Sequence, residues 1–251
     1  MRRLSALLLV SMSVLAGCAK SDASARPAAT PATAGTAKAT SRTAPTDSMA
    51  IAATPADSAL RAAADAGRIT GADSAPVWLL VVSDFECPYC RQWHLESHAV
   101  VLRDYVAAGK IRLAYVNFPL PSHTHALPAA EAAMCASAQG KFTPYADKLF
   151  ETQPQWHEMG SAPAQELFAD LAKEVGLDVA TWNTCTSSGA MRPLVLADRE
   201  RARQANVGST PTFLLGQTRI PGVMPLGAFR QAIDDELARA RAAKGDSTRT
   251  R

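Results

Sequence analysis

The apolar positions of this chain predict its elements before any chemistry is considered. The run PVWLLVVSDF at 76–85 is continuously apolar and β-branched, which is typical of a strand buried on both faces. Pro88 suits the first turn of a following helix, because its missing N–H would be unpaired there. That helix is expected to reach about Ala107, with one apolar stripe formed by Trp93, Val100, Val101 and Tyr105. KIRLAYVNFP at 110–119 is the next strand, so the order predicts a right-handed crossover with parallel strands.

Helical patterns fill most of the chain after the second strand. They occur in PAAEAAMCASAQG, TPYADKLFETQ, PAQELFADLAKEVG, DVATWNTCTSSG and PLVLADRERARQANVG. Strand patterns return only in TPTFLLG at 210–216 and TRIPGV at 218–223, which a tight turn joins. A last amphipathic helix carries Phe229, Ile233 and Leu237, and a short helix at 57–67 precedes the first strand. The order is β-α-β, a helical block and β-β-α, which predicts an α/β fold.

The first eighteen residues have the features of an export signal. Two arginines give a positive start, and the apolar run from Leu4 to Leu15 is too short to span a bilayer. The segment ends in VLAGC, which resembles the lipobox of bacterial lipoproteins. That resemblance implies that Cys18 is the first mature residue and carries a lipid anchor, and Ala19 after it resembles outer-membrane sorting in enterobacterial lipoproteins. The alternative is an ordinary signal peptide with a chance cysteine.

Residues 19–56 are predicted to be a tether. The segment consists of Ala, Thr, Ser and Pro with scattered charge, and no aromatic residue precedes Trp78. Such a segment cannot bury enough apolar area to offset the entropy of ordering it. As a random coil it spans roughly 30–40 Å, enough to hold a domain away from a membrane surface. The folded domain is expected at 57–245, and a polar tail at 246–251.

Composition and charge exclude several classes of function. The formal net charge is only +3, from 26 basic and 23 acidic residues, so no nucleic-acid partner is expected. The chain has no GxGxxG or phosphate-loop pattern, and no cofactor is expected. Charged residues interrupt the helical segments too often for a bilayer span.

The five cysteines allow several arrangements. A lipid on Cys18 leaves four thiols in an exported protein, which suggests disulfide pairs. Spacing does not determine connectivity, and three pairings are possible. Cys87 with Cys90 is the local choice, and it leaves Cys135 with Cys185.

Four motifs in order give the chain a family resemblance. DFECPYC, FPLPSHTHA, AAMCASAQGKF and VGSTPTFLLG together resemble the DsbA-like thiol–disulfide oxidoreductases over about 68–240. The resemblance implies a thioredoxin fold with a helical insertion at about 126–190, with Cys87 and Cys90 as the redox pair. It also implies that Pro211 is a cis-proline facing that pair and that Thr210 binds extended substrate. Some members carry a second disulfide, which supports a structural Cys135–Cys185 bond.

The chemistry of the pair follows from its position. Cys87 ends a strand and caps a helix, where free N–H groups and the helix dipole favour the thiolate that attacks disulfides. Cys90 lies one turn on, so the sulfurs can bond while Cys87 stays exposed. The intervening Pro88 and Tyr89 resemble the glutaredoxin dipeptide, and an uncharged Tyr89 predicts a less extreme oxidant than the DsbA type.

No proton acceptor for the buried cysteine is assigned from sequence. Val81 stands at the position six before Cys87, where DsbA relatives can carry a buried acid. Asp84 and Glu86 are nearer but are free to point to solvent. His123 and His125 are expected to be exposed loop residues rather than groove residues.

The same residues allow other interpretations. Cys87, Cys90, His94 and His98 could ligate zinc, but a structural zinc site usually has a second ligand pair on another segment, so no metal is expected. Arg91, where c-type haem attachment needs His, excludes haem. A non-catalytic binding module is disfavoured because both cysteines are present. Three further side chains are expected to pack the helical insertion: Trp156, His157 and Trp182.

The resulting prediction is a membrane-tethered, extracytoplasmic thiol:disulfide oxidoreductase, with oxidase activity favoured over reductase or isomerase activity. Its partners are expected to be exported protein thiols or disulfides and a membrane redox partner. A monomer is expected, because the dimerisation domain of the dimeric isomerases is replaced here by the tether. The expected location is the cell envelope, on the outer membrane if the cell is Gram-negative.

Overall fold

The computed structural model describes residues 55–249. The predicted export signal, Cys18 and nearly all of the predicted tether lie outside the described residues. Within 55–249, no helix is both long enough and apolar enough to cross a membrane.

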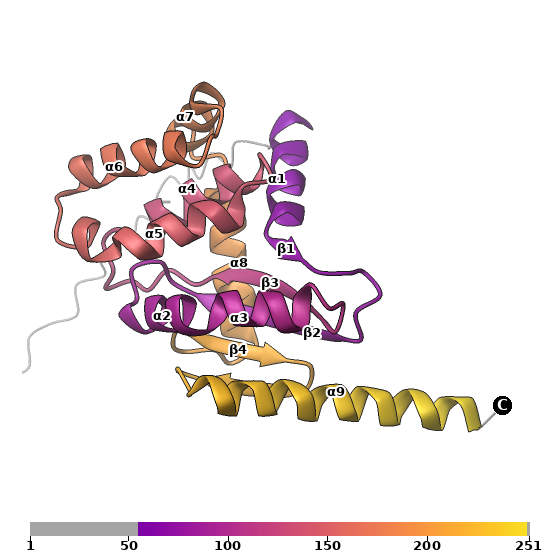
Figure 1. Ribbon diagram of the computed structural model, residues 1–251. Helices are drawn as coiled ribbons and strands as arrows, with labels where there is room; N and C mark the ends of the chain where they lie inside the picture. The colour runs from indigo at the N-terminus through magenta and orange to yellow at the C-terminus, as the bar shows by residue number, and fades with distance from the viewer. Residues whose placement is uncertain (1–54, 250–251) are drawn as a thin grey trace, which may run out of the picture. The chain divides into compact units, whose positions relative to one another are not determined.

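A mixed sheet of five strands forms the centre of the fold (Figure 1). In sequence order they are β1 (Ile69–Thr70), β2 (Val77–Ser83), β3 (Ile111–Asn117), β4 (Thr212–Leu215) and β5 (Thr218–Pro221). In space the order is β1-β3-β2-β4-β5, with β2 and β3 parallel and the other pairs antiparallel. β2 is therefore central, and Leu79 and Val81 on it are fully buried, as its continuous apolar run predicts.

The helix after β2 is continuous but irregular. α2 (Pro88–Trp93) and α3 (Ala99–Val101) alternate with two π-helical stretches, η1 (His94–His98) and η2 (Leu102–Val106). Trp93, Val101 and Tyr105 of the predicted stripe are buried. Val100 is only partly buried, because π-helical turns contain more residues than the 3.6-residue period assumes. We call residues 88–106 the active-site helix.

A helical insertion separates β3 from the last two strands. It comprises α4 (Ala126–Ser137), α5 (Phe142–Trp156), α6 (Ser161–Glu174) and α7 (Val179–Ser187), followed by α8 (Arg192–Gln204). α4 to α7 together span residues 126–187. A disulfide joins Cys135 on α4 to Cys185 on α7, and their Cα atoms are 5.9 Å apart.

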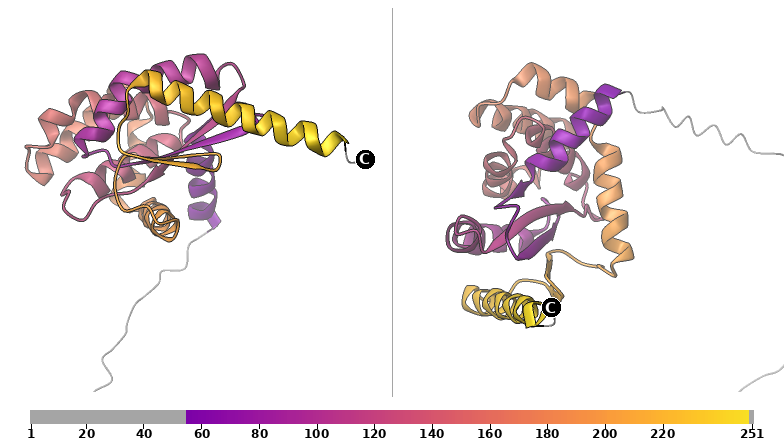
Figure 2. Two further views of the ribbon diagram at one scale, coloured as in Figure 1. Left: turned by 90° about the horizontal axis from the view of Figure 1, so that it is seen from below. Right: turned by 90° about the vertical axis from the view of Figure 1, so that its right-hand side faces the viewer.

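Helices cover both faces of the sheet. The active-site helix and α9 (Leu226–Arg249) lie on one face, and α8 lies on the other (Figure 2). α1 (Pro55–Gly67) precedes the sheet and packs on α4. α9 continues to Arg249, through residues expected in the polar tail. The elements therefore confirm an α/β fold with a helical insertion between its β-α-β and β-β-α parts.

Candidate active site

Cys87 lies where the chain passes from β2 into the active-site helix. It is the N-cap of α2, with φ −73° and ψ 122°, and Pro88 follows in the first turn. The first N–H groups of a helix lack intrahelical partners and carry the positive end of its dipole. Cys90 lies in that first turn, and the two thiols are unbonded. The strand thus delivers Cys87 to the position where a helix stabilises a thiolate best.

Cys87 is less exposed than the sequence indicates. The sequence predicts that Cys87 stays exposed, but only 4% of it is accessible, against 1% for Cys90. The loop before β4 covers it: the Sγ of Cys87 lies 3.4 Å from the carbonyl oxygen of Thr210. Thr210 and Pro211 are buried and joined by a cis peptide bond. The structure therefore brings Cys87, Cys90, Thr210 and Pro211 together.

The two thiols have opposite electrostatic environments. A hydrogen bond from Cys90 is the main cause that lowers the pKa of Cys87 to about 6, with further help from Thr210 and from backbone N–H groups, against the effect of burial. Burial raises the pKa of Cys90 well above that of an ordinary thiol, and hydrogen bonding to Cys87 adds to the rise. The backbone N–H of Asp84 lies 3.4 Å from the Sγ of Cys90. The lowered pKa of Cys87 and the raised pKa of Cys90 favour the thiolate at Cys87.

Asp84 is buried, not directed to solvent as the sequence left open. Its carboxylate accepts hydrogen bonds of 2.8 Å from the backbone N–H groups of Glu86 and Leu120, and it lies 2.8 Å from Nδ1 of His123. Burial nevertheless raises the pKa of Asp84. Only 2% of the residue is exposed. Asp84 therefore fixes the loop before Cys87 against the loop after β3.

Glu86 is buried in the same way. It accepts a 2.6 Å hydrogen bond from the backbone N–H of His125 and lies 3.2 Å from Nδ1 of His157. His125 is itself buried and its Nε2 donates to the carbonyl of Met159 at 2.9 Å. The expectation that His123 and His125 are exposed loop residues is wrong, because they pair with buried acids and with the helical insertion.

Gln153 of α5 is a site residue that the sequence did not reveal. Its amide donates to the carbonyls of Phe85 at 2.6 Å and Cys87 at 3.1 Å. Gln153 thus links the insertion to residues 85–87, which we call the redox loop. No local signal marks it, because Gln153 and Cys87 are 66 residues apart.

Residues expected to pack the insertion have different environments. Trp156 and Trp182 are buried, and the indole N–H of Trp182 donates to the carbonyl of Ala132 at 3.1 Å. His157 has a side chain that is 49% exposed and reaches Glu86 rather than the core of the insertion. Its assignment as a packing residue is therefore wrong.

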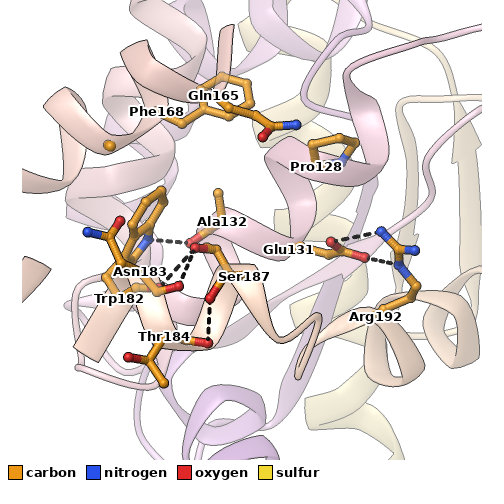
Figure 3. Close-up of a pocket in the computed structure, with 12 residues that line it drawn as sticks. Pro128, Glu131, Ala132, Gln165, Phe168, Trp182, Asn183, Thr184, Ser187 and Arg192 are labelled. Atoms are coloured by element: carbon orange, nitrogen blue, oxygen red, sulfur yellow. Dashed lines mark hydrogen bonds and ion pairs between the residues drawn. The ribbon is translucent and has the colours of Figure 1, made fainter. Parts of the chain in front are cut away.

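Hollows on the described part of the chain include one beside the cysteines and one in the insertion. One, of about 530 Å³, adjoins the cysteines and is lined by Tyr89, Gln92, Glu96, Thr210, Gly222, Val223, Met224 and Pro225. The other, of about 600 Å³, lies among the helices of the insertion, with the ion pair of Glu131 and Arg192 at one edge (Figure 3). Only the first shares residues with the redox site.

The zinc ligand set weighed from the sequence does not form. Among the described residues, one group of at least three His, Cys, Asp or Glu side chains is close enough to hold an ion, and it contains neither Cys87 nor Cys90. It consists of His94, His98 and Asp147.

Comparison with known proteins assigns the family. The family model described as Thioredoxin matches residues 63–235, more than half of the chain. The chain belongs to the thioredoxin family. It is 28% identical over 171 residues to the probable disulfide bond formation protein D of Bacillus anthracis, covering 66% of this chain and 76% of that protein.

Solved structures show the same fold at low sequence identity. BdbD from Bacillus subtilis, in its oxidised form, is similar with a TM-score of 0.61 and 23% identity, over 69% of this chain and 94% of that one. The α-DsbA1 of Wolbachia pipientis is similar with a TM-score of 0.62 and 18% identity, over 70% and 93%. The thioredoxin fold with a helical insertion is confirmed, and so is the DsbA-like thiol:disulfide oxidoreductase resemblance.

Proposed function

We propose that this thiol:disulfide oxidoreductase works as an oxidase of exported proteins, with Cys87 as the exchanging sulfur and Cys90 as the resolving one. The observation that carries the proposal is the asymmetry of the pair. Cys87 sits at a helix N-terminus beside the Thr210 carbonyl, while Cys90 is buried behind it. Only the thiolate attacks or leaves readily, so Cys87 is suited to meet the substrate.

The oxidase cycle starts from a Cys87–Cys90 disulfide. A substrate thiolate attacks the Sγ of Cys87, the bond between the two enzyme sulfurs breaks, and Cys90 leaves as a thiolate that takes up a proton. A second thiolate of the same substrate then attacks the substrate sulfur that is bonded to Cys87, and Cys87 leaves as a thiolate. The substrate has gained a disulfide and lost two electrons, and the enzyme pair holds those electrons. A reductase runs the same steps backwards.

The environment of Cys87 favours the oxidase direction. Its pKa of about 6 means that the reduced pair is stabilised as a thiolate at neutral pH. For a two-electron couple, each tenfold gain in the stability of the reduced form raises the potential by about 30 mV. A stabilised reduced form makes the pair a stronger oxidant. Tyr89 between the cysteines adds no positive charge, so we expect a weaker oxidant than the DsbA type.

The hollow beside the cysteines is the proposed substrate site. It joins Tyr89 of the active-site helix to Thr210 and to the Gly222–Pro225 segment after β5. Val223, Met224 and Pro225 give it an apolar side, which suits an unfolded chain that presents a cysteine beside apolar residues. Thr210 is proposed to pair with the backbone of that chain.

Location and partners belong to the same proposal. The VLAGC motif supports a lipid on Cys18, which places the domain on a membrane outside the cytoplasm, on the outer membrane if the cell is Gram-negative. Residues 19–56 are then proposed to be the tether that holds the domain away from the membrane surface. A membrane redox partner would accept the two electrons and restore the Cys87–Cys90 disulfide. The domain is proposed to act as a monomer.

Serine substitutions of the two cysteines test the residue roles. Cys87→Ser is expected to abolish oxidation of a reduced, unfolded protein, because no sulfur remains to form the mixed disulfide. Cys90→Ser is expected to accumulate mixed disulfides through Cys87, seen as adducts on non-reducing gels and by mass spectrometry. The double variant Cys135→Ser/Cys185→Ser is a control outside the pair and is expected to keep the exchange chemistry. Normal turnover by Cys87→Ser would sink the assignment.

A further inference from the structure

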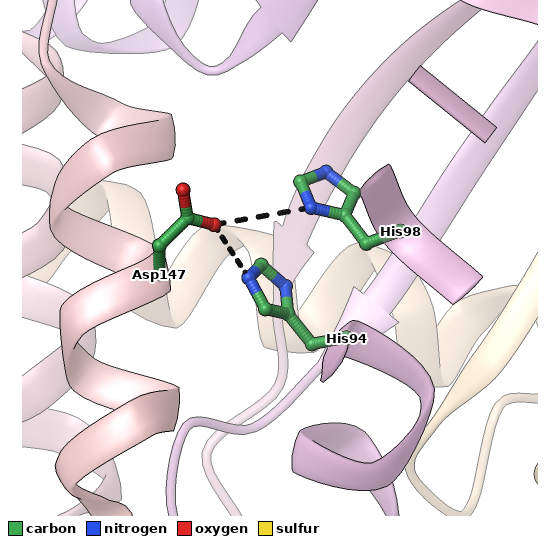
Figure 4. A group of neighbouring side chains, drawn as sticks. All are labelled: His94, His98 and Asp147. Carbon is green, nitrogen blue, oxygen red and sulfur yellow. Dashed lines mark hydrogen bonds and ion pairs between the residues drawn. The ribbon is translucent and has the colours of Figure 1, made fainter. Parts of the chain in front are cut away.

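A second group of titratable side chains lies one helical turn beyond Cys90. His94 and His98 belong to the π-helical stretch η1, and Asp147 belongs to α5 of the insertion (Figure 4). One nitrogen or oxygen atom from each residue lies within 4.8 Å of the other two. The thiol chemistry described above uses none of the three.

The three side chains converge on one carboxylate oxygen. Nε2 of His94 lies 2.7 Å from Oδ1 of Asp147, and Nδ1 of His98 lies 4.0 Å from the same atom. The two imidazole rings are stacked, with centroids 4.4 Å apart and planes at 26°. Bonds of about 2.1 Å to a tetrahedral metal would hold ligand atoms roughly 3.4 Å apart. The distances from Oδ1 of Asp147 to His94 and to His98, 2.7 and 4.0 Å, lie on either side of that value. A small movement of Asp147 would therefore make the two distances equal.

His98 has no conventional partner in this position. Only 3% of His98 is exposed, and its Nε2 has no hydrogen-bond partner among the described residues. The 4.0 Å from its Nδ1 to Asp147 exceeds hydrogen-bond distance. Buried polar side chains without partners are rare and call for an explanation, such as an ion. A metal bound at Nδ1 gives the ring a partner on the side that faces Asp147, while Nε2 points away from Asp147 and keeps its present surroundings.

His94 is oriented as metal-binding histidines are. Its Nδ1 lies 2.8 Å from the hydroxyl of Tyr115, which leaves Nε2 facing Asp147. Histidine ligands commonly hydrogen-bond through the other ring nitrogen, which fixes the ring. Tyr115 is buried on β3, so this support is rigid. The side chain of Asp147 is 43% exposed, which leaves a route for an ion and a place for a water ligand.

We propose that His94, His98 and Asp147 bind one divalent first-row transition-metal ion, for which Zn²⁺ is the probe. Two imidazoles and a carboxylate suit this class of ion, and a water molecule can complete a tetrahedron. The ion links the active-site helix to α5 and so fastens the insertion to the redox domain. This inference goes beyond the exchange chemistry and revises the sequence-based expectation of no metal.

The test is a Zn²⁺ titration of the full chain by calorimetry. The Cys87–Cys90 pair is first oxidised and Cys18 alkylated, so that no thiol competes, and bound metal is removed with a chelator. We expect one Zn²⁺ per chain. Asp147→Ala, at a partly exposed position, and His98→Phe, which keeps an aromatic ring, should each weaken binding at least tenfold, on the order of the losses seen for metal-site substitutions. Glu151→Ala, one turn along α5, is the matched control and should bind as the parent chain does.

Two further readouts exclude a nonspecific effect. Co²⁺ in the parent chain should give the visible absorption of a four-coordinate site, and Asp147→Ala should lose it. Zn²⁺ should raise the melting temperature of the parent and of Glu151→Ala but not of the two ligand variants. Absence of saturable Zn²⁺ binding, or equal affinity in all four chains, would overturn the proposal and leave His94 and Asp147 as a plain hydrogen-bonded pair.

Discussion

Individual side chains decide how the two cysteines differ. Cys87 and Cys90 are separated by two residues and are both buried, yet one has a pKa of about 6 and the other a pKa well above the ordinary range. The difference comes from the hydrogen bond between them, from the helix N-terminus at Cys87 and from the deeper burial of Cys90. The thiolate therefore forms at one sulfur only.

The pH dependence of alkylation tests this difference. The lowered pKa means that Cys87 is mainly thiolate above about pH 6, and that this stabilisation of the reduced pair is lost as the pH falls through 6. The rate of alkylation of Cys87 in the reduced chain should follow a titration with its midpoint at about pH 6. Cys90→Ala removes the main hydrogen bond, so its midpoint should move upward. A midpoint near about 8.5 in the parent chain, as for a free cysteine, would contradict the account.

Sequence reasoning at the residue scale succeeded for local features and failed for distant ones. The CxxC spacing, the strand before it and Pro88 after it were enough to place Cys87 at a helix N-terminus. The burial of Asp84 and Glu86 was missed because their partners, His123, His125 and His157, come from segments 39 to 71 residues away. Nothing near an acid in the sequence shows that such partners will cover it.

At the scale of the elements, the sequence again predicts some features and misses others. The apolar runs predicted β2, β3, β4 and β5 and the helices of the insertion, because burial on a sheet or a helix face leaves a periodic pattern. The π-helical turns of η1 and η2 were not predicted, since one extra residue per turn disturbs the period without a distinctive residue type. His94 and His98, whose rings are stacked, both lie in η1. The contact of α5 with the redox loop through Gln153 is a tertiary feature with no pattern of its own.

The disulfide between α4 and α7 is expected to stabilise the insertion. It closes a loop between residues 50 apart, which on the chain-entropy model contributes about 4 kcal/mol to the free energy of unfolding. The double variant Cys135→Ser/Cys185→Ser should unfold at lower denaturant concentration by about that free energy and keep its exchange activity in native conditions. A well-folded variant that has lost exchange activity would show that this bond takes part in the chemistry.

On the scale of the whole described domain, the insertion and the thioredoxin part share one core. One large apolar cluster contains buried residues of β2, the active-site helix, α4, α5 and α9 together with Cys87 and Cys90, and a second, smaller cluster contains Val82 of β2. The order of elements was predictable from the motifs that resemble the DsbA-like family. The way in which the insertion packs on the redox loop was not, because it depends on contacts between distant segments.

The proposed lipid anchor gives a separate prediction at the scale of the whole chain. When the full gene product is made in an exporting bacterium, the parent chain should carry a diacylglycerol group on Cys18 and stay with the membrane fraction after a salt wash. Cys18→Ser should lose the lipid, as measured by intact-mass analysis. An unlipidated parent chain cleaved elsewhere would mean an ordinary signal peptide.

The reduction potential of the Cys87–Cys90 pair tests the central claim most directly. It is measured by equilibrating the protein with glutathione buffers and following the fraction oxidised. Strong oxidants have a reduction potential of about −120 mV. The account predicts a potential closer to that value than to the value of thioredoxin, and somewhat below about −120 mV because Tyr89 adds no positive charge. A value near about −270 mV, that of thioredoxin, would contradict it and make the protein a tethered reductase.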